Sequence, residues 1–202
     1  MTDLERYIST TDSAYEWKDN NWKIYGEDYL GLADYNWITL TSQQYLSTDF
    51  VDAEEGLIWK HNVIICAGEI STELDSADFG TITLSGYGVG PDIEEYPRRK
   101  NEVDKVCKQA AQLGTVGVIL DGIPTSVKFN DADAAESEGF QITGAKYFFD
   151  GEADISAIPE FPEAKAISMT MNMVDEYLMG KGVRKAPITR WSVRRCHLRS
   201  ME

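Results

Sequence analysis

A short β-branched run leads directly into three alternating glycines, and this segment is the best suited of any in the chain to do chemistry. The run Thr81-Ile-Thr-Leu-Ser85 continues as Gly86-Tyr-Gly-Val-Gly90. Glycines at the end of a buried strand let backbone N–H groups point at a phosphate or an oxyanion. We therefore expect a functional site at the C-terminal end of this strand, with a plain glycine turn as the alternative.

This glycine pattern does not match the fingerprints of nucleotide-binding proteins. Gly86 and Gly88 have the G-x-G spacing, but position 91 is proline and no third glycine follows at the dinucleotide-binding offset. The Gly-Lys-Ser/Thr of a phosphate-binding P-loop does not occur in the sequence either. Nucleotide binding is thus a weak interpretation, and we expect no cofactor.

Cysteine and histidine are too sparse to suggest a metal site. Cys66, Cys107 and Cys196 are widely separated and have no C-x-x-C spacing, and only His61 and His197 are available to join them. A zinc site is therefore not expected, and the calcium-loop template also fails. The cysteine spacing favours buried free thiols over a single disulfide, which would need an oxidising compartment.

The chain is strongly acidic, and its charge is unevenly distributed. The formal net charge is −15 over 202 residues, which excludes non-specific binding to nucleic acid or to an anionic membrane surface. From residue 180 onward, however, seven basic residues accompany a single acid. This segment is a basic partner-binding tail, a strand end surrounded by charge, or sequence foreign to the fold.

Neither a leader nor a membrane span is expected from the sequence. The N-terminus Met1-Thr-Asp-Leu-Glu-Arg6 carries acids where a secretory signal peptide needs basic residues followed by an apolar run. No segment reaches the ~20 consecutive apolar residues of a transmembrane helix. As written, the chain is expected to stay in the cytoplasm.

Residues 1–30 are predicted to form an aromatic-rich N-terminal arm. Rings recur there among polar neighbours, at Tyr7, Tyr15, Trp17, Trp22, Tyr25 and Tyr29. Such spacing suits an extended arm whose rings anchor on a larger body. A carbohydrate-binding or base-stacking platform is the alternative, although the lack of surrounding basic residues disfavours stacking on nucleic acid.

The body of the fold, predicted over residues 31–193, begins with strands. The segments 35–42 and 58–66 have strand-like patterns and are joined by an acidic, turn-like connection. They fit best as an antiparallel pair at one edge of a sheet. The run 79–84 is apolar enough to be a central strand.

A helix and further strands complete an alternating pattern. Apolar or small residues recur close to the 3.6-residue period over 93–113, and residues 115–120 are again β-branched. With the strand at 79–84, these segments predict a βαβ unit with a parallel pair, and hence an α/β fold. A second amphipathic helix is expected over 164–179 and a last strand over 188–193, whereas the acidic stretch 131–144 is expected to be a solvated loop or helix face.

Five short motifs, taken in their order and spacing, add a resemblance to this picture. They are Leu4-Glu-Arg-Tyr-Ile8, Leu40-Thr-Ser-Gln43, Trp59-Lys-His61, Leu84-Ser-Gly-Tyr-Gly88 and Gly114-Thr-Val-Gly-Val-Ile119. Together they resemble the N-terminal part of the PhoPQ-activated pathogenicity-related proteins, a group that includes the autocrine proliferation repressors. The resemblance extends over residues 4–193.

The resemblance implies an α/β-hydrolase-like fold: a mostly parallel sheet with flanking helices and an antiparallel N-terminal edge. It also implies a secreted protein in which the strand 189–193 runs into a nucleophile elbow of the small-x-Ser-x-Gly type. After Val193 the sequence departs from this pattern, and the acid and histidine that follow the serine in the family do not occur. We therefore expect a fold truncated before the elbow, with a foreign basic tail over 194–202.

No serine of the sequence matches the expected elbow. Ser85 precedes the glycine loop, and Ser192 lies within the last predicted strand. The resemblance implies an oxyanion-hole-like loop at Gly86, Tyr87 and Gly88, where a hydrolase of this fold positions its oxyanion-hole amides. Pairing of Ser192 or Ser200 with His197 is a less favoured alternative. We therefore expect no catalytic residue and no metal ligand.

The function expected first is that of a truncated, non-catalytic family member, at most a binding or signalling module with an unknown protein partner or receptor. One alternative is a serine hydrolase, esterase or peptidase-like, that is active only as a longer product. Another is a protein-interaction module that uses the N-terminal arm and the basic tail.

Overall fold

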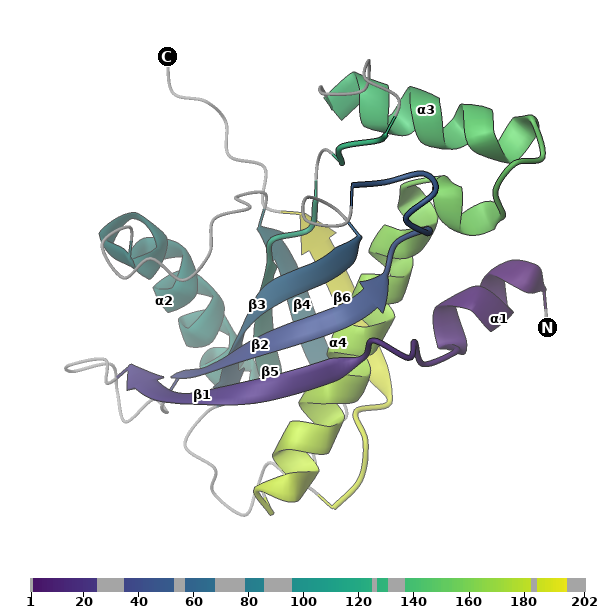
Figure 1. Ribbon diagram of the computed structural model, residues 1–202. Coiled ribbons are helices and arrows are strands. Elements are labelled where there is room, and N and C mark those ends of the chain that lie inside the picture. The colour runs from purple at the N-terminus through teal and green to yellow at the C-terminus, as the bar shows by residue number, and fades with distance from the viewer. Residues whose placement is uncertain are drawn as a thin grey trace. The chain divides into compact units, whose positions relative to one another are not determined.

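From β4 onward, strands alternate with helices along the chain. The structure is a computed structural model and describes residues 2–24, 35–52, 57–67, 79–85, 96–124, 127–130, 137–182 and 185–195. The helices in these parts are α1 (Asp3–Ser9), α2 (Tyr96–Leu113), α3 (Ser137–Phe149) and α4 (Glu160–Gly180), with a short 3₁₀ helix, η3, at Ile155–Ala157. The strands are β1 (Glu16–Ile24), β2 (Tyr35–Gln44), β3 (Ile58–Ala67), β4 (Phe79–Ser85), β5 (Val116–Asp121) and β6 (Arg190–Arg195) (Figure 1).

The strands form one six-stranded sheet in the order β1-β2-β3-β5-β4-β6. β4 pairs in parallel with both β5 and β6, whereas β3 pairs antiparallel with β5. The predicted βαβ unit is thereby confirmed as β4, α2 and β5. The fold is a mixed α/β fold with flanking helices, and its parallel part lies at the β5-β4-β6 end of the sheet.

Burial of the strands follows their place in the sheet. Every residue of β5 is buried, as is β4 from Ile82 to Ser85, because both strands have neighbours on each side. β6 lies at the end of the sheet and is mostly exposed. Trp191 of this strand lies over Gly80 of β4, where an added Cβ would be 2.5 Å from the indole ring.

The chain divides into two compact units. The first comprises residues 1–17, 40–61 and 123–171, and the second comprises residues 18–39, 62–122 and 172–202.

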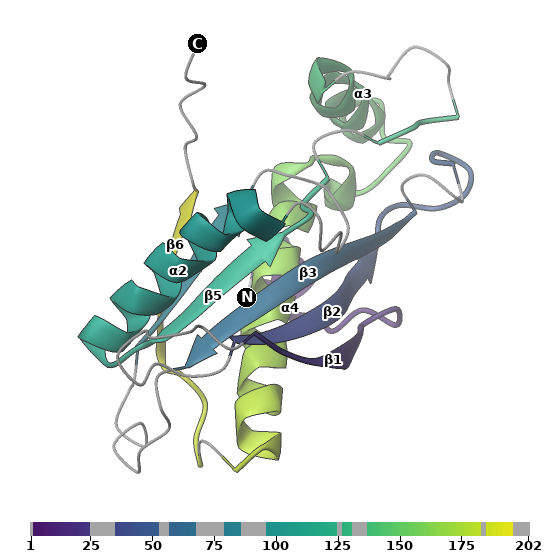
Figure 2. The same cartoon turned by 90° about the vertical axis from the view of Figure 1, so that its left-hand side faces the viewer.

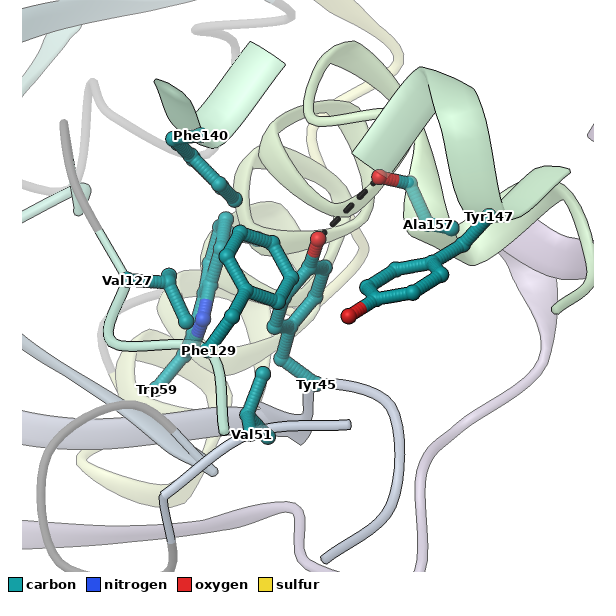
Figure 3. Packing of buried hydrophobic residues seen from close by; sticks show 9 residues of the cluster. Tyr45, Val51, Trp59, Val127, Phe129, Phe140, Tyr147 and Ala157 are labelled. Atoms are coloured by element: carbon teal, nitrogen blue, oxygen red, sulfur yellow. Dashed lines mark hydrogen bonds between the residues drawn. The ribbon is translucent and has the colours of Figure 1, made fainter. Parts of the chain in front are cut away.

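Aromatic side chains fill the core of the first unit (Figure 3). The ring of Tyr45 lies 5.4 Å from that of Trp59 and 5.7 Å from that of Phe140, between centroids. The Tyr45 hydroxyl donates a hydrogen bond of 3.1 Å to the carbonyl oxygen of Ala157. Because Phe140 and Tyr147 both come from α3, one face of this helix is buried, although the sequence predicted only a solvated segment there.

The first residues of the chain fold as α1, a helix that the aromatic pattern did not predict. Thr2 and Glu5 close a capping box at its start. Beyond the helix, Asp12 Oδ2 accepts a hydrogen bond of 3.1 Å from Lys165 Nζ, and this ammonium lies 4.7 Å from the centroid of the Tyr7 ring. These contacts hold the N-terminal segment against α4 within the first unit.

In the second unit, α2 lies on one face of the sheet and residues 172–180 of α4 lie on the other (Figure 2). Helix α2 packs closely on β5 because Gly117 of β5 has no side chain. A Cβ added at this glycine would lie 2.8 Å from the Cβ of Ala110. The buried cluster under α2 is small and consists of Cys66, Val103, Val106, Cys107 and Ile119.

Cys66 and Cys107 form a disulfide between β3 and α2, with their Cα atoms 5.1 Å apart. The expectation of free thiols is therefore wrong for these two residues. Their spacing in the sequence carried no sign of the pairing, because the fold brings β3 and α2 together through the packing of the helix on the sheet. Cys196 lies outside the described residues.

Candidate functional site

The predicted loop residues Gly86, Tyr87 and Gly88 lie outside the described residues. The elements on either side of this segment are described: β4 ends at Ser85, and α2 begins at Tyr96. The candidate site is therefore built from the strand ends around this segment, all of which belong to the second unit.

The carboxyl ends of β4 and β5 bring two polar side chains side by side. Ser85 and Asp121 are paired in the parallel register, and both are the last residues of their strands. They are 5% and 3% exposed, so a hydroxyl and a carboxyl group are buried together at this edge. Asp121 is also in register with Asn62 of β3.

The carboxyl end of β6 adds guanidinium groups to the same edge. Arg194 is in register with Thr83, and its Nε donates a hydrogen bond of 3.0 Å to the Thr83 hydroxyl oxygen. Arg195 is in register with Leu84. Both arginines are exposed, whereas Thr83 is buried.

Alternation along the strands places these groups on one face of the sheet. Thr83 is in register with Ile119, which contacts α2, and Ser85 and Arg194 share the face of Thr83. This face therefore presents hydroxyl, carboxyl and guanidinium groups toward the carboxyl edge. Thr83, Ser85 and Asp121 are buried, so the exposed guanidinium of Arg194 is the group of this set that can donate hydrogen bonds to a polar or anionic ligand.

The strands that follow β4 in the sequence are added on opposite sides of it: β5 on one side and β6 on the other. From β4 the chain passes through α2 to β5 on one side, and from β5 it returns through α4 to β6 on the other side. Within the second unit, α2 and residues 172–180 of α4 lie on opposite faces of the sheet (Figure 2). In open α/β sheets, ligands bind outside the strand ends at such a reversal. In this sheet the reversal lies between β4 and β6.

The other serines considered from the sequence have different surroundings. Ser192 lies within β6, in register with Thr81 of β4, and does not stand at a strand-to-helix turn. His197 and Ser200 lie outside the described residues, so their pairing with Ser192 remains untested.

A buried serine–histidine pair is present in the first unit, and the sequence reasoning did not single it out. Ser42 Oγ and His61 Nε2 are 2.7 Å apart, and the residues are 0% and 1% exposed. A nucleophile must reach its substrate, so burial on this scale makes the pair a structural hydrogen bond between β2 and β3. Both residues belong to the motifs that carry the family resemblance, which was the available signal.

Neither a metal-binding cluster nor a membrane-spanning helix occurs among the described residues. Among them, no group of three or more His, Cys, Asp or Glu side chains is arranged to hold a metal ion. No helix in the described parts of the chain has the length and apolar character needed to cross a bilayer.

The strand order and the polar carboxyl edge define a mixed α/β protein with a candidate ligand site at the ends of β4 and β6. The chain belongs to the PhoPQ-activated pathogenicity-related protein family, whose model matches residues 4–194. This match confirms the family that the five motifs indicated. No curated protein and no solved structure matches the chain.

Proposed function

We propose that this chain is an α/β-hydrolase-like binding module that holds a ligand, carried by a protein partner or receptor, at the carboxyl ends of β4 and β6 without hydrolysing it. The observation that carries the proposal is the parallel pairing of β6 with β4, which sets Arg194 against Thr83 at the reversal point of the sheet. A polar crevice at such a point is the usual place for a ligand in this class of sheet.

The arrangement of the elements supports the comparison with hydrolases. In α/β hydrolases, one oxyanion-hole amide comes from the loop between a strand and its following helix, and the nucleophile comes from a sharp turn at the same edge of the sheet. β4, the segment 86–95 and α2 correspond to the first arrangement. The carboxyl end of β6 corresponds to the place of the second.

The residues at that second place support binding rather than catalysis. In a hydrolase, the strand runs into a small-x-Ser-x-Gly turn, but here β6 ends in Arg194-Arg195 and the sequence continues as Cys196-His-Leu-Arg-Ser200. Guanidinium groups at this position bind carboxylates or phosphates and cannot act as nucleophiles. An anionic group on the partner is therefore the expected ligand.

A covalent probe for activated serines tests this proposal. We expect a fluorophosphonate probe to leave every serine of the folded chain unlabelled, with no more labelling than in heat-denatured protein. A Ser192→Ala variant serves as the control for the only serine of β6. Stoichiometric labelling of one serine, together with hydrolysis of a p-nitrophenyl ester, would overturn the non-catalytic assignment.

A second candidate, a serine hydrolase active as a longer product, rests on the same topology. It requires a reading frame that passes from β6 into a small-x-Ser-x-Gly turn. Sequencing of the transcript across the codons for Trp191 to Arg195 distinguishes the two candidates, because only the hydrolase needs the longer frame.

We further propose that the protein acts in an oxidising compartment, as the family resemblance implies. The Cys66–Cys107 disulfide supports this location, because such bonds persist in secreted proteins and are rare in the cytosol. Mass spectrometry of the protein from its native source tests the proposal: the oxidised pair is expected, and two free thiols would contradict it.

A further inference from the structure

We propose that the Cys66–Cys107 disulfide is a redox latch: it holds α2 on the sheet, and its reduction releases the helix. Three features of the second unit carry this inference: the covalent loop that the bond closes, the small cluster beneath α2, and the burial of both sulfur atoms. The consequence for a ligand rests on the proposed function, whereas the release of α2 does not.

The disulfide closes a loop that contains two residues of the candidate site, Thr83 and Ser85. Its two cysteines are 41 residues apart, and the chain between them includes β4 with Thr83 and Ser85, and then Gly86, Tyr87 and Gly88. One end of the loop is fixed in β3, which pairs with β5, and the other lies in α2. The bond therefore limits how far α2 can move from β5.

The packing under α2 depends heavily on the two cysteines. Among the side chains that the structure describes, they are two of the five residues in the buried cluster; the others are Val103, Val106 and Ile119, with Ile64 partly buried beside them. Close contact of Ala110 with Gly117 adds little apolar area, because one partner is a glycine. Few buried apolar contacts are typical of a segment that opens locally.

Reduction requires that this opening has already begun. Cys66 is 3% and Cys107 is 6% exposed, so a dithiol cannot reach either sulfur in the closed state. Once α2 opens, a thiolate of the dithiol attacks one sulfur, forms a mixed disulfide and releases the other cysteine as a thiolate. The second thiol of the reagent then attacks the mixed disulfide, leaving two cysteine thiols and the reagent as a cyclic disulfide. Two electrons pass from the reagent to the protein.

The reduced state is therefore expected to keep α2 open more often, with the first unit intact. The first unit contains none of the chain's three cysteines, and its aromatic core is held by separate contacts. In an oxidising compartment the candidate site is held in place, whereas in a thiol-rich compartment it is loosened.

Hydrogen–deuterium exchange tests the latch without any ligand. The protein is compared oxidised, reduced with dithiothreitol, and reoxidised, in a Cys196→Ser background that removes the third thiol. We expect amides of α2 to exchange at least tenfold faster after reduction and to recover on reoxidation, while those of α3 stay unchanged. The Cys66→Ser, Cys107→Ser double variant is expected to match the reduced protein.

Two results would overturn the latch. Unchanged exchange of α2 after complete reduction, verified by the mass of alkylated thiols, would show that the disulfide does not hold the helix. Equal acceleration in α2 and α3 would show global unfolding, in which case the bond is a structural cross-link alone. Neither result depends on the serine-labelling test, so failure of the latch and failure of the proposed function can be distinguished.

Discussion

At Gly144, helix α3 passes so close to η3 that a single methyl group has no room. A Cβ at this position would overlap the carbonyl oxygen of Ala157. That carbonyl also accepts the hydrogen bond from Tyr45, so it cannot move away without breaking a buried contact. The residue that allows α3 to join the aromatic core is therefore a glycine in the middle of a helix.

We predict that Gly144→Ala lowers the free energy of unfolding by about 1–3 kcal/mol, because overpacking outweighs the better helix propensity of alanine. Urea unfolding followed by tryptophan fluorescence measures the effect. Gly180→Ala at the end of α4 is the matched control, since no atom lies within 4 Å of the new Cβ. Equal urea midpoints of unfolding for the two variants would contradict the close approach of Gly144 to the carbonyl oxygen of Ala157.

The carboxyl group of Asp12 links pH to the stability of the first unit. Burial by itself raises the pKa of Asp12, but hydrogen bonds from the amide of Ala14, from Lys165 and from the amide of Gln44, with the charge of Lys165, together hold it below the ordinary 3.8. Because the folded pKa is lower than the unfolded one, the charged carboxylate stabilises the fold above the unfolded value. This contribution is lost as the pH falls through the folded pKa.

We predict that Asp12→Asn lowers the free energy of unfolding by about 2 kcal/mol near neutral pH, the usual size for hydrogen bonds to a charged group. The difference from the natural chain is expected to shrink as the pH falls from the ordinary pKa of aspartate through the lower folded pKa, below which both proteins carry a neutral side chain. Denaturant unfolding at a series of pH values measures it. Asp150→Asn changes the same charge at an exposed position and serves as the control. A deficit that is constant with pH would refute the role of the carboxylate.

At the scale of elements, the sequence predicted the parallel half of the sheet well. β4, α2, β5 and α4 occur where periodicity placed them, because their buried faces alternate cleanly and glycine or proline marks their ends. Helix α1 was missed, and the region of α3 was predicted only as a solvated loop or helix face. The capping box of Thr2 and Glu5 is visible in the sequence, but the aromatic spacing of residues 1–30 favoured an extended arm. The acidic residues before α3 favoured a solvated segment, although Phe140 and Tyr147 are buried.

Pairings distant in the sequence could not be predicted from local patterns. Nothing in the residues of β6 indicates that it lies beside β4, and nothing in the spacing of Cys66 and Cys107 indicates a bond. Each depends on how helices pack on the sheet. The glycine segment was a sound starting point for a site, but Ser85, Asp121 and Arg194 entered it only through the strand register.

We predict that the Cys66→Ala, Cys107→Ala double variant is less stable than the oxidised protein by about 4 kcal/mol, the chain-entropy value for a loop of this length. Thermal and denaturant unfolding measure the loss. After reduction with dithiothreitol, the natural chain should have a free energy of unfolding close to that of the variant. A variant as stable as the oxidised protein would show that the bond adds no constraint to the unfolded chain.

For the molecule as a whole, the charge distribution and the sheet topology both favour the carboxyl ends of β4 and β6 as the place of a ligand site. The chain is acidic overall, with a net charge of −15, yet β6 brings Arg194 and Arg195 to the carboxyl edge. An anionic ligand is repelled by most of an acidic protein, and local guanidinium groups give it one favourable place to bind. The second unit thus contains a chemically distinct edge beside the reversal of its strands.

Site-specific photocrosslinking tests this placement most directly. A benzophenone amino acid is introduced at exposed Arg194, on the carboxyl edge, or at Leu113, which is 59% exposed and precedes β5 at the opposite edge. Each variant is irradiated in the fluid from which the native protein is purified. We predict a discrete cross-linked partner from position 194 that is competed by excess natural chain, and none from position 113. The same partner captured from 113 and not from 194 would contradict a ligand site at the ends of β4 and β6.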